Sequence, residues 1–367
     1  MGVIKQVLVI AFSAWLLLRI IALNRSLRIG RFGLSFYNHN PGPCKIFHVN
    51  GSEDIVLLPN GLAIFSSGLD FTLSPIGPDP AMKNFVGMLY SFDINNPDHS
   101  PQPLKFDNFH SKFAPHGIDL YIDPQSGEVS LFVVNHGNDN QTIEIFMLDM
   151  TNMVLKHKRT VFDEKIYSPN DLVAVGPESF YVTNDRYFIN TWLLVVETTY
   201  PLKLCSVVYY DGKQSKFVAS NLNFANGINM DLSEKYIFVA SGSDGEVIVF
   251  ERDINNNLLK RQHIQVGALL DNINVDEEGH LWLGVAHFDV VAYSSNFTRP
   301  CPGAVLQVRL SKSGNPEVPF NVDDIREVFG NDGKGQVKCV SSGLFYRGKM
   351  LVGNPFSNVM YCKVNEF

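Results

Sequence analysis

The chain has 367 residues, of which 30 are Lys or Arg and 37 are Asp or Glu, so the formal net charge at pH 7 is −7. This acidic balance argues against nucleic acid as a partner, because there is no cationic excess to displace counterions from phosphates. A hydrophobic content of 45% excludes a disordered chain, and five cysteines are too few for a disulfide-dense scaffold.

The N-terminal segment contains an apolar run at residues 7–23, VLVIAFSAWLLLRIIAL, interrupted only by Ser13 and Arg19. The run is at the short end of a membrane span and is longer than the apolar region of a secretory signal peptide. We therefore predict an uncleaved transmembrane signal anchor at 7–23. A short flank at 1–6 precedes it, and a juxtamembrane linker at 24–43 leads to a folded domain at 44–367. A cleaved signal peptide and an interfacial helix are the alternatives.

The orientation of this anchor is indicated by two conflicting signals. Arg25, Arg28 and Arg31 follow the apolar run, and by the charge rule alone they place the folded domain in the cytoplasm. Four N-x-S/T sequons instead favour a secretory route, and Asn140 and Asn296 are the expected glycosylation sites because they lie in loop-like stretches. We expect a single-pass membrane protein whose folded domain is lumenal, in the endoplasmic reticulum, or extracellular. A secreted form is the alternative.

The rest of the chain is rich in short β-type runs bounded by Gly, Asp, Asn or Pro. Six segments share one design: a polar start, a hydrophobic strand, an acidic or glycine turn, and a second strand. They begin near residues 52, 115, 169, 225, 271 and 341, a spacing that suits one four-stranded propeller blade each. The sequence therefore predicts an all-β, six-bladed β-propeller with a central tunnel. Two separate β-sandwiches would not explain why the same start recurs.

The polar starts of these segments are candidate metal ligands, because the innermost strands of all blades begin at one end of the tunnel. The residues are Glu53, Asp54, His116, Asn170, Asp171, Asn226, Asp271 and Asn272. Carboxylates buried together repel one another and need a cation. Oxygen ligands that include amides, without cysteine, favour Ca²⁺. The alternative is that these are turn residues facing solvent.

At these residues the sequence resembles the paraoxonase family of calcium-dependent lactonases and arylesterases. The motifs that carry the resemblance stand in order from Cys44 to Cys362: GSEDIVLLPNGLAIFSSG, PHGI, FVVNH, PNDLVAVGPESFY, TND-x-YF, FANGIN, DNI-x-VD and LW-x-G. The resemblance implies a six-bladed propeller with two calcium ions in its tunnel and a retained N-terminal hydrophobic segment.

The resemblance also implies roles for individual residues. The catalytic calcium would be held by Glu53, Asn170, Asn226, Asp271 and Asn272. The deeper, structural calcium would be held by Asp54, Asp171 and the backbone carbonyl of Ile118. The family's histidine pair corresponds to His116 and His136, and its disulfide corresponds to Cys44 and Cys362. From the residues alone, these two cysteines could equally be unrelated buried thiols.

The chemistry expected from such a site is hydrolysis of a lactone or an aryl ester. Calcium would polarise the carbonyl oxygen and stabilise the oxyanion. His116 would take a proton from the attacking water, and His136 would orient His116 and share the charge. The alternative for His116 is a structural histidine bonded to the backbone at a strand start.

Departures from the family pattern lie at the expected substrate rim. Arg186 in TNDRYF replaces a histidine, and Asp70-Phe71 replaces Lys-Tyr after SSGL, while Phe224 in NFANGIN keeps an aromatic wall. We place Phe71, Arg186 and Phe224 at this rim, where Arg186 could alter substrate choice or pair with a carboxylate. Some invertebrate relatives are membrane-anchored chaperones or accessory subunits of ion channels. Such a role, with little or no catalysis, is the alternative function.

The remaining cysteines give weaker signals. Cys205 lies in an apolar strand and is expected to be a buried thiol, whereas Cys301 and Cys339 could form a second disulfide. Nothing in the sequence fixes the distance between the last two, so their pairing stays open.

Overall fold

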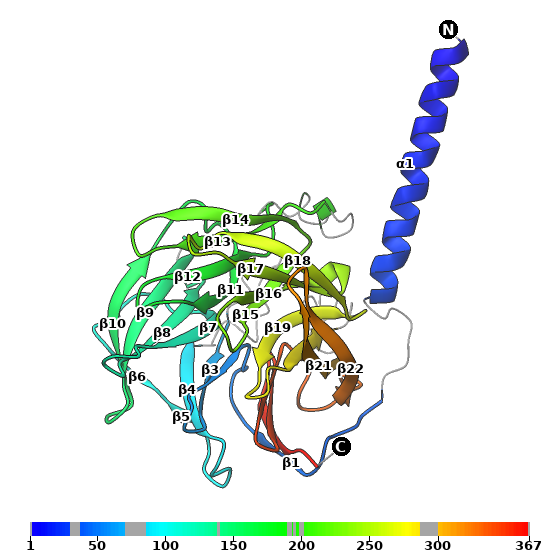
Figure 1. Ribbon diagram of the computed structural model, residues 1–367. Helices are drawn as coiled ribbons and strands as arrows, with labels where there is room; N and C mark the ends of the chain where they lie inside the picture. The colour runs from blue at the N-terminus through cyan, green and yellow to red at the C-terminus, as the bar shows by residue number, and fades with distance from the viewer. Residues whose placement is uncertain are drawn as a thin grey trace.

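Strands dominate the computed structural model, which describes residues 2–29, 37–69, 86–137, 140–188, 193, 196–197, 202–286 and 300–365, with the side chains of 2–29 described only in part. In these residues the strands form six sheets, arranged around a common centre (Figure 1). The prediction of a six-bladed β-propeller is therefore confirmed, and each sheet is one blade.

Five blades are formed by consecutive strands, with the innermost strand first. Blade 1 contains β2 (Ile55–Leu57), β3 (Leu62–Ser67), β4 (Met88–Asp93) and β5 (Gln102–Pro103). Blade 2 contains β7 (Pro115–Ile122), β8 (Val129–Asn135), β9 (Thr142–Asp149) and β10 (Val154–Val161), with β6 (Lys105–Asp107) parallel to its outer edge. Blade 3 contains β11 (Pro169–Ala174), β12 (Phe180–Asn184), β13 (Cys205–Tyr210) and β14 (Ser215–Leu222).

Blade 4 contains β15 (Ala225–Met230), β16 (Tyr236–Ser241), β17 (Glu246–Arg252) and β18 (Leu258–Gln265), with the 3₁₀ turn η3 (Gly242–Asp244) after β16. Blade 5 contains β19 (Leu269–Val275), β20 (Leu281–Ala286), β21 (Gly303–Asn315) and β22 (Val318–Asn331). Blade 6 contains β23 (Ser342–Tyr346), β24 (Lys349–Gly353), β25 (Val359–Lys363) and β1 (Cys44–Phe47). The six innermost strands begin within a few residues of the starts predicted from the sequence.

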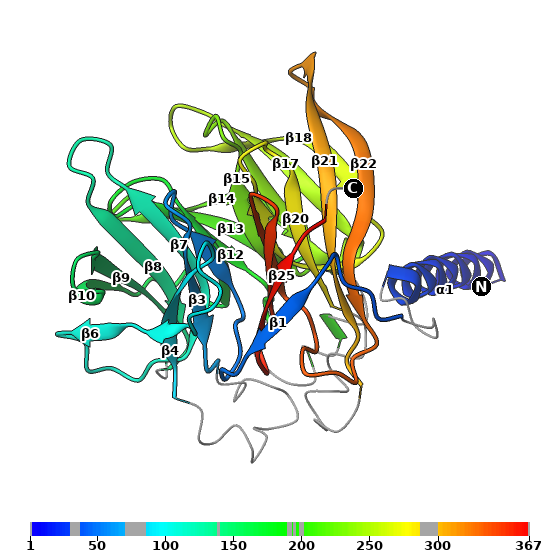
Figure 2. The same cartoon turned by 90° about the horizontal axis from the view of Figure 1, so that it is seen from below.

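The ring closes because the first strand of the chain completes the last blade. Strand β1 pairs antiparallel with β25, and Cys44 lies opposite Cys362 in this pairing, as Figure 2 shows for the blue and red strands. A disulfide joins these two cysteines, so the predicted pairing is confirmed. The structure also contains the Cys301–Cys339 disulfide that the sequence left open, and Cys205 is a free, buried thiol as expected.

The hydrophobic core is divided among the interfaces between successive blades. Six apolar clusters of described residues occupy these interfaces, one for each, including one between blades 6 and 1. The inner and middle strands are therefore buried on both faces, as in β8 (VSLFVVN), where every residue is buried. Outer strands such as β18 (LLKRQHIQ), in which only Ile264 is buried, are mostly half-buried or exposed. This difference explains why the inner strands appear in the sequence as continuous apolar runs.

Helix α1 (Gly2–Ile29) covers the apolar run at residues 7–23. When only the described residues are considered, no helix has the length and apolar character that a membrane span requires. The anchor stays a prediction from the sequence.

Candidate metal centre and histidine pair

The predicted site residues lie where the innermost strands begin, and four of these starts carry a β-bulge. The bulges enclose His116-Gly117, Asn170-Asp171, Asn226-Gly227 and Asp271-Asn272. A bulge sets two successive residues opposite one on the partner strand and breaks the alternation of side chains. The side chains of neighbours such as Asn170 and Asp171 can therefore both lie on the channel side of the strand. The channel is the space enclosed by the six innermost strands. An unbroken strand would turn one of these side chains away.

Two of these bulges contain a glycine because the adjacent blade comes too close for a side chain. A Cβ atom on Gly117 would lie 2.5 Å from the Cα atom of Asp171, and one on Gly227 would lie 2.6 Å from the carbonyl oxygen of Asp271. Both distances are shorter than any real contact of a Cβ atom. The glycines of PHGI and FANGIN thus bring the strand starts of successive blades together.

Four buried oxygen atoms at these starts have no hydrogen-bond partner among the described residues. They are Glu53 Oε2, Asn170 Oδ1, Asn226 Oδ1 and Asn272 Oδ1, from blades 1, 3, 4 and 5. The exposed fraction of each residue is 4% or less. Leaving a buried oxygen unpaired is costly, and a cation bound by oxygen atoms removes that cost. These residues therefore fit the predicted ligand set for a calcium ion.

The carboxylates around the channel have raised pKa values, as expected for buried acids without a positive charge nearby. Burial raises the pKa of Glu53 to about 8. Burial and the neighbouring Glu53 raise the pKa of Asp54 to about 7. The pKa values of Asp171 and Asp271 are also well above the usual range, first through burial and then through repulsion from Asp54 and Glu53, respectively. A divalent cation would stabilise the ionised form of all four.

The candidate centre depends on asparagine as well as on acidic residues. When only His, Cys, Asp and Glu of the described chain are counted, no group of three or more could hold a metal ion. Asn170, Asn226 and Asn272 supply three of the four unpaired oxygen atoms. This composition favours calcium over zinc, because zinc prefers His and Cys, whereas calcium accepts amide oxygens.

The ligands predicted for the deeper calcium also link neighbouring blades. Asp54 Oδ2 accepts a hydrogen bond from the backbone N–H of Ile118 at 2.9 Å. Asp171 Oδ2 accepts one from the N–H of Ile228 at 2.8 Å. The structure thus brings Asp54 and Ile118 together through the N–H of Ile118, and a metal-binding role for the Ile118 carbonyl stays a prediction.

The histidine pair lies beside the candidate metal ligands. His116 Nδ1 and His136 Nε2 are 2.8 Å apart, and His116 Nε2 lies 3.5 Å from Glu53 Oε1. Burial lowers the pKa of His116 to about 4 and that of His136 to about 3. Both rings are therefore neutral at pH 7. Glu53 connects the two parts of the site, because its other oxygen, Oε2, is one of the unpaired atoms.

Two polar residues that contact the predicted site were missed in the sequence. Gln141 Oε1 is hydrogen-bonded to His136 Nδ1. With this oxygen as acceptor, His136 carries its proton on Nδ1 and accepts the Nδ1 proton of His116 on Nε2. The Nε2 lone pair of His116 then faces Glu53 and the channel. Gln141 carries no recognisable motif, so its contact could not have been found from the sequence.

The second missed residue is Asp185, which is buried next to Arg186. Burial alone would raise the pKa of this carboxyl, but the Arg186 guanidinium, bonded to it at 2.8 and 2.7 Å, lowers the pKa to about 2. Asp185 also accepts hydrogen bonds from Ser168 Oγ at 2.6 Å and Asn170 Nδ2 at 3.5 Å. Of the two roles expected for Arg186, pairing with a carboxylate is confirmed.

Asp185 could have been found from a repeated pattern. It follows Asn184 at the end of β12, as His136 follows Asn135 at the end of β8. The amide oxygen of Asn135 accepts the N–H groups of Ala114 and Gly137, and that of Asn184 accepts those of Tyr167 and Ser168. The sequences V-N-H and T-N-D thus mark equivalent places in blades 2 and 3.

The other predicted rim and surface positions are only partly described. Phe224 is half-buried immediately before β15, and its carbonyl accepts the N–H of Gly242. Asn140 is exposed, which suits its predicted glycosylation. Phe71 and Asn296 lie outside the described residues.

Comparison with known proteins gives a consistent set of relatives. A family model described as arylesterase matches residues 41–364. The chain is 34% identical over 321 residues to serum paraoxonase/arylesterase 2 of Gallus gallus, with 86% of each chain covered. It is 36% identical over 321 residues to serum paraoxonase/lactonase 3 of Oryctolagus cuniculus, with 85% of this chain and 86% of the relative covered.

Among solved structures, a luciferin-regenerating enzyme matches with a TM-score of 0.52 and 11% identity. The match covers 87% of this chain and 94% of that one. At this identity the likeness concerns the fold alone.

Proposed function

The chain belongs to the arylesterase family, the family of the paraoxonases, and from this premise we propose that it hydrolyses lactones or aryl esters in a calcium-dependent reaction at the channel. One observation supports this most directly. Glu53 offers one oxygen to His116 at 3.5 Å, while its other oxygen and three asparagine oxygens are buried without partners. Glu53 therefore contacts the proposed general base, His116, and also belongs to the set of oxygen atoms that could bind a cation.

The ligands proposed for the catalytic ion are Glu53, Asn170, Asn226, Asp271 and Asn272, and those for a second ion are Asp54, Asp171 and the Ile118 carbonyl. Calcium, when bound, would supply a Lewis acid for the ester carbonyl and a counter-charge for the oxyanion. The asparagine amides make the set flexible enough for the six to eight oxygen atoms that calcium takes.

The proton is handled by the chain's own residues. His116 is neutral at pH 7, because burial lowers its pKa to about 4, so its Nε2 lone pair can take a proton from water. His136 accepts the Nδ1 proton of His116 at 2.8 Å and keeps the ring oriented. Glu53, 3.5 Å from His116 Nε2, and the nearby carboxylate of Asp185 favour the imidazolium, whereas Arg186 opposes it.

The same proposal includes the compartment. The two disulfides of the propeller favour an oxidising compartment, and the relatives are named as serum proteins. We therefore place the propeller in the endoplasmic reticulum lumen or outside the cell, behind the signal anchor at 7–23. Endoglycosidase sensitivity of the intact chain, and its loss when both Asn140 and Asn296 are replaced with Gln, would test the orientation.

The activity is tested with the full-length protein in detergent and calcium, assayed on a panel of lactones and aryl esters. His116→Gln should lower kcat/KM by about 100-fold or more, the usual contribution of a general base. His99→Gln is the control, because His99 is exposed on a loop, and it should leave the rate unchanged. A wild-type chain that is stable and binds calcium, yet turns over no lactone or ester, would contradict the proposal and favour the channel-accessory role.

A further inference from the structure

A pocket lies between blades 6 and 1, at the end of the propeller opposite the histidine pair. It encloses about 510 Å³ and is lined by residues of β1, β24 and β25 and of the loop that follows β4. The innermost strand of blade 6, β23, begins at Ser342 and ends at Tyr346, and Lys349 of the pocket follows this end. The lining contains neither the histidine pair nor any candidate metal ligand, so the pocket is distinct from the candidate metal centre.

Four side chains that line the pocket share one face of blade 6. Lys45 lies opposite Tyr361 in the pairing of β1 with β25, and Lys349 lies opposite Lys363 in the pairing of β24 with β25. Tyr361 and Lys363 are two residues apart on β25. Residues directly opposite, and residues two apart on a strand, are on the same face of a sheet. The register therefore gathers three ammonium groups around one tyrosine.

The hydroxyl group of Tyr361 is buried and has no hydrogen-bond partner among the described residues. The residue is 4% exposed, and its ring packs edge-on against Phe92 in the apolar cluster between blades 6 and 1. Burial raises the pKa of Tyr361, and the carboxylate of Asp98, which also lines the pocket, raises it further. The hydroxyl therefore keeps its proton at pH 7. An unpaired buried donor is costly, and a ligand that accepts its hydrogen bond removes the cost.

The lysines of the pocket have neutral partners instead of acidic ones. Lys45 Nζ donates hydrogen bonds to the carbonyl oxygens of Pro97 and Asp98 at 2.9 and 3.5 Å, and Lys349 Nζ donates one to Asn95 Oδ1 at 2.7 Å.

The pocket therefore has an excess of positive charge. No ion pair joins a carboxylate to Lys45, Lys349 or Lys363 in the part of the chain that the structure describes. Three lysines and one aspartate, Asp98, give the lining a net charge of +2 at pH 7. Lys349 and Lys363 also repel each other, because they lie directly opposite. An anion in the pocket would relieve this repulsion.

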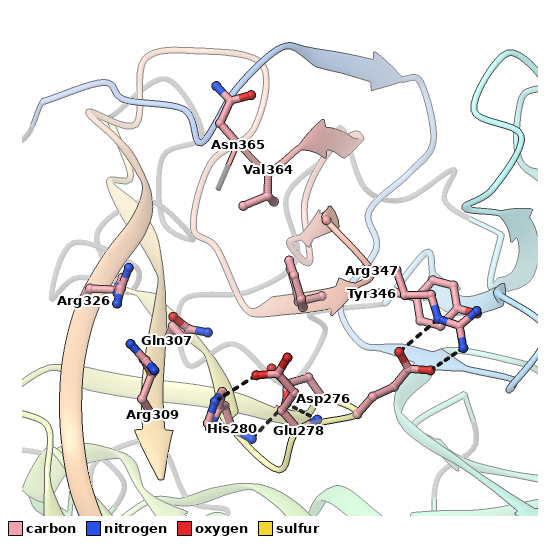
Figure 3. Close-up of a pocket in the computed structure, with 13 residues that line it drawn as sticks. Asp276, Glu278, His280, Gln307, Arg309, Arg326, Tyr346, Arg347, Val364 and Asn365 are labelled. Carbon is pink, nitrogen blue, oxygen red and sulfur yellow. Dashed lines mark hydrogen bonds and ion pairs between the residues drawn. The ribbon is translucent and has the colours of Figure 1, made fainter. Parts of the chain in front are cut away.

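The larger pocket between blades 5 and 6, which Figure 3 shows, has no such imbalance. Its lining contains as many carboxylates as guanidinium groups. Arg347 donates two hydrogen bonds to Glu277, at 2.9 and 3.1 Å, and His280 lies 3.3 Å from Glu278. None of its lining side chains has a buried polar atom without a partner. Of these two pockets, only the one between blades 6 and 1 combines excess positive charge with an unpaired buried donor.

We propose that the pocket between blades 6 and 1 binds a phosphate group, either as the free anion or as the monoester of a small molecule. A phosphate carries a charge of about −1.5 to −2 at pH 7, which matches the net charge of the lining. Its oxygens accept a hydrogen bond from the Tyr361 hydroxyl and charge-assisted hydrogen bonds from Lys349 and Lys363. This inference does not rest on the hydrolase function, because none of these residues belongs to the site proposed for that reaction.

The test is calorimetric titration of the full-length protein with inorganic phosphate, phenyl phosphate and phenyl sulfate at low salt. We expect phosphate to bind, and we expect phenyl sulfate to bind more weakly than phenyl phosphate because it carries a single negative charge. Tighter binding of phenyl phosphate than of inorganic phosphate would identify the ligand as a monoester. Equal or tighter binding of inorganic phosphate would identify it as the free anion.

Two variants test the assigned residues. Tyr361→Phe removes only the hydroxyl and should weaken phosphate binding about tenfold. Without phosphate it should unfold at the same midpoint as the wild type or at a higher one, because the hydroxyl has no partner to lose. Lys363→Met should also weaken binding about tenfold, and without phosphate it should not be less stable, because it removes the repulsion of Lys349.

The matched control is Lys216→Met. Lys216 lies in blade 3, and its Nζ also binds neutral oxygens, Asn255 O at 2.7 Å and Asn257 Oδ1 at 2.8 Å. This variant should change the affinity for phosphate less than about twofold. All three variants should keep the lactone hydrolysis of the wild type, so failure of this proposal is distinguishable from failure of the proposed function.

Three results would overturn the phosphate site. The first is that no phosphate binds at millimolar concentration. The second is that Tyr361→Phe and Lys363→Met bind phosphate as tightly as Lys216→Met does, which would place the binding elsewhere, for example at the metal centre. The third is a lower unfolding midpoint of Tyr361→Phe without phosphate, which would show that the hydroxyl has a structural partner in the protein.

Discussion

Replacing Asn170 with leucine should have opposite effects on stability with and without calcium. In the calcium-free protein, Asn170 Oδ1 is buried without a partner, and the amide nitrogen makes one long hydrogen bond of 3.5 Å to Asp185. Leucine has a similar shape and removes the unpaired oxygen. The substitution therefore removes a penalty when calcium is absent and removes a ligand when calcium is present.

The expected magnitudes follow from these contacts. A buried polar group without a partner costs about 1–3 kcal/mol, and the lost hydrogen bond is worth about 1 kcal/mol at most. Without calcium, Asn170→Leu should thus be as stable as the wild type or up to about 2 kcal/mol more stable. If losing one ligand weakens calcium binding about 100-fold, the stabilisation by saturating calcium falls by about 2.7 kcal/mol. Together with the gain in the calcium-free protein, this makes the variant about 0.7–2.7 kcal/mol less stable than the wild type at saturating calcium.

The assay is the urea or thermal unfolding of the full-length protein at a series of free calcium concentrations. The curves of midpoint against calcium for the wild type and for Asn170→Leu should cross. The control is Asn184→Leu in the same blade. Asn184 makes hydrogen bonds to Tyr167, Ser168, Lys165 and Ser206, so this variant should be destabilised equally at all calcium concentrations. An Asn170→Leu variant that behaves like the control would refute the assignment of Asn170 as a metal ligand.

Three further predictions concern the carboxylates, the histidine pair and the ring closure. In EDTA the unfolding midpoint should fall as pH rises from about 4.5 to about 8, because the folded-state pKa values of Glu53 and Asp54 are raised from their ordinary range to about 8 and about 7. A raised carboxyl pKa stabilises the fold at low pH and loses that effect as pH rises through it. Calcium should abolish the fall, and an equal fall with calcium would contradict the metal assignment. Gln141→Leu should lower kcat about tenfold with little change in KM. Gln141→Glu should restore kcat, because the carboxylate supplies a hydrogen-bond acceptor for His136. An unchanged kcat in Gln141→Leu would remove Gln141 from the mechanism. Replacing both Cys44 and Cys362 with alanine removes a cross-link between residues 318 positions apart in the chain. This should lower the free energy of unfolding, measured by urea denaturation, by up to about 5 kcal/mol. A loss below about 1 kcal/mol would show that β1 holds the ring together without the disulfide.

The sequence was sufficient to predict the ring and which polar residues meet at the starts of its innermost strands. In the sequence of each blade, the innermost strand begins with a polar residue that is followed by an apolar run. Six such starts indicate six blades. The residues at the starts converge because the propeller repeats one strand position around an axis. Glu53, Asn170, Asn226 and Asn272 could therefore be named together although they are far apart in the chain.

What the sequence could not provide is the register that brings specific atoms into contact. The bulges at Asn170-Asp171 and at the equivalent starts depend on pairing with the second strand, and a motif does not encode pairing. Gln141 contacts His136, five residues away in the chain, with no pattern to mark it. Lys45, Tyr361 and Lys363 share a face only because β1 and β25 pair in one particular register.

The contacts that close the ring also position the residues of the candidate site. Glu53 lies between β1, which completes blade 6, and β2, which begins blade 1. Its backbone carbonyl accepts hydrogen bonds from Asn272 Nδ2 of blade 5 at 3.0 Å and from Ser341 Oγ, next to blade 6, at 2.6 Å. The residue that joins the histidine pair to the unpaired oxygen atoms is thus positioned by contacts across the seam of the ring. Any loosening of that seam displaces Glu53 from His116 and Asn272 together, so the closure by β1 and the Cys44–Cys362 disulfide supports the geometry of the site as well as the stability of the fold.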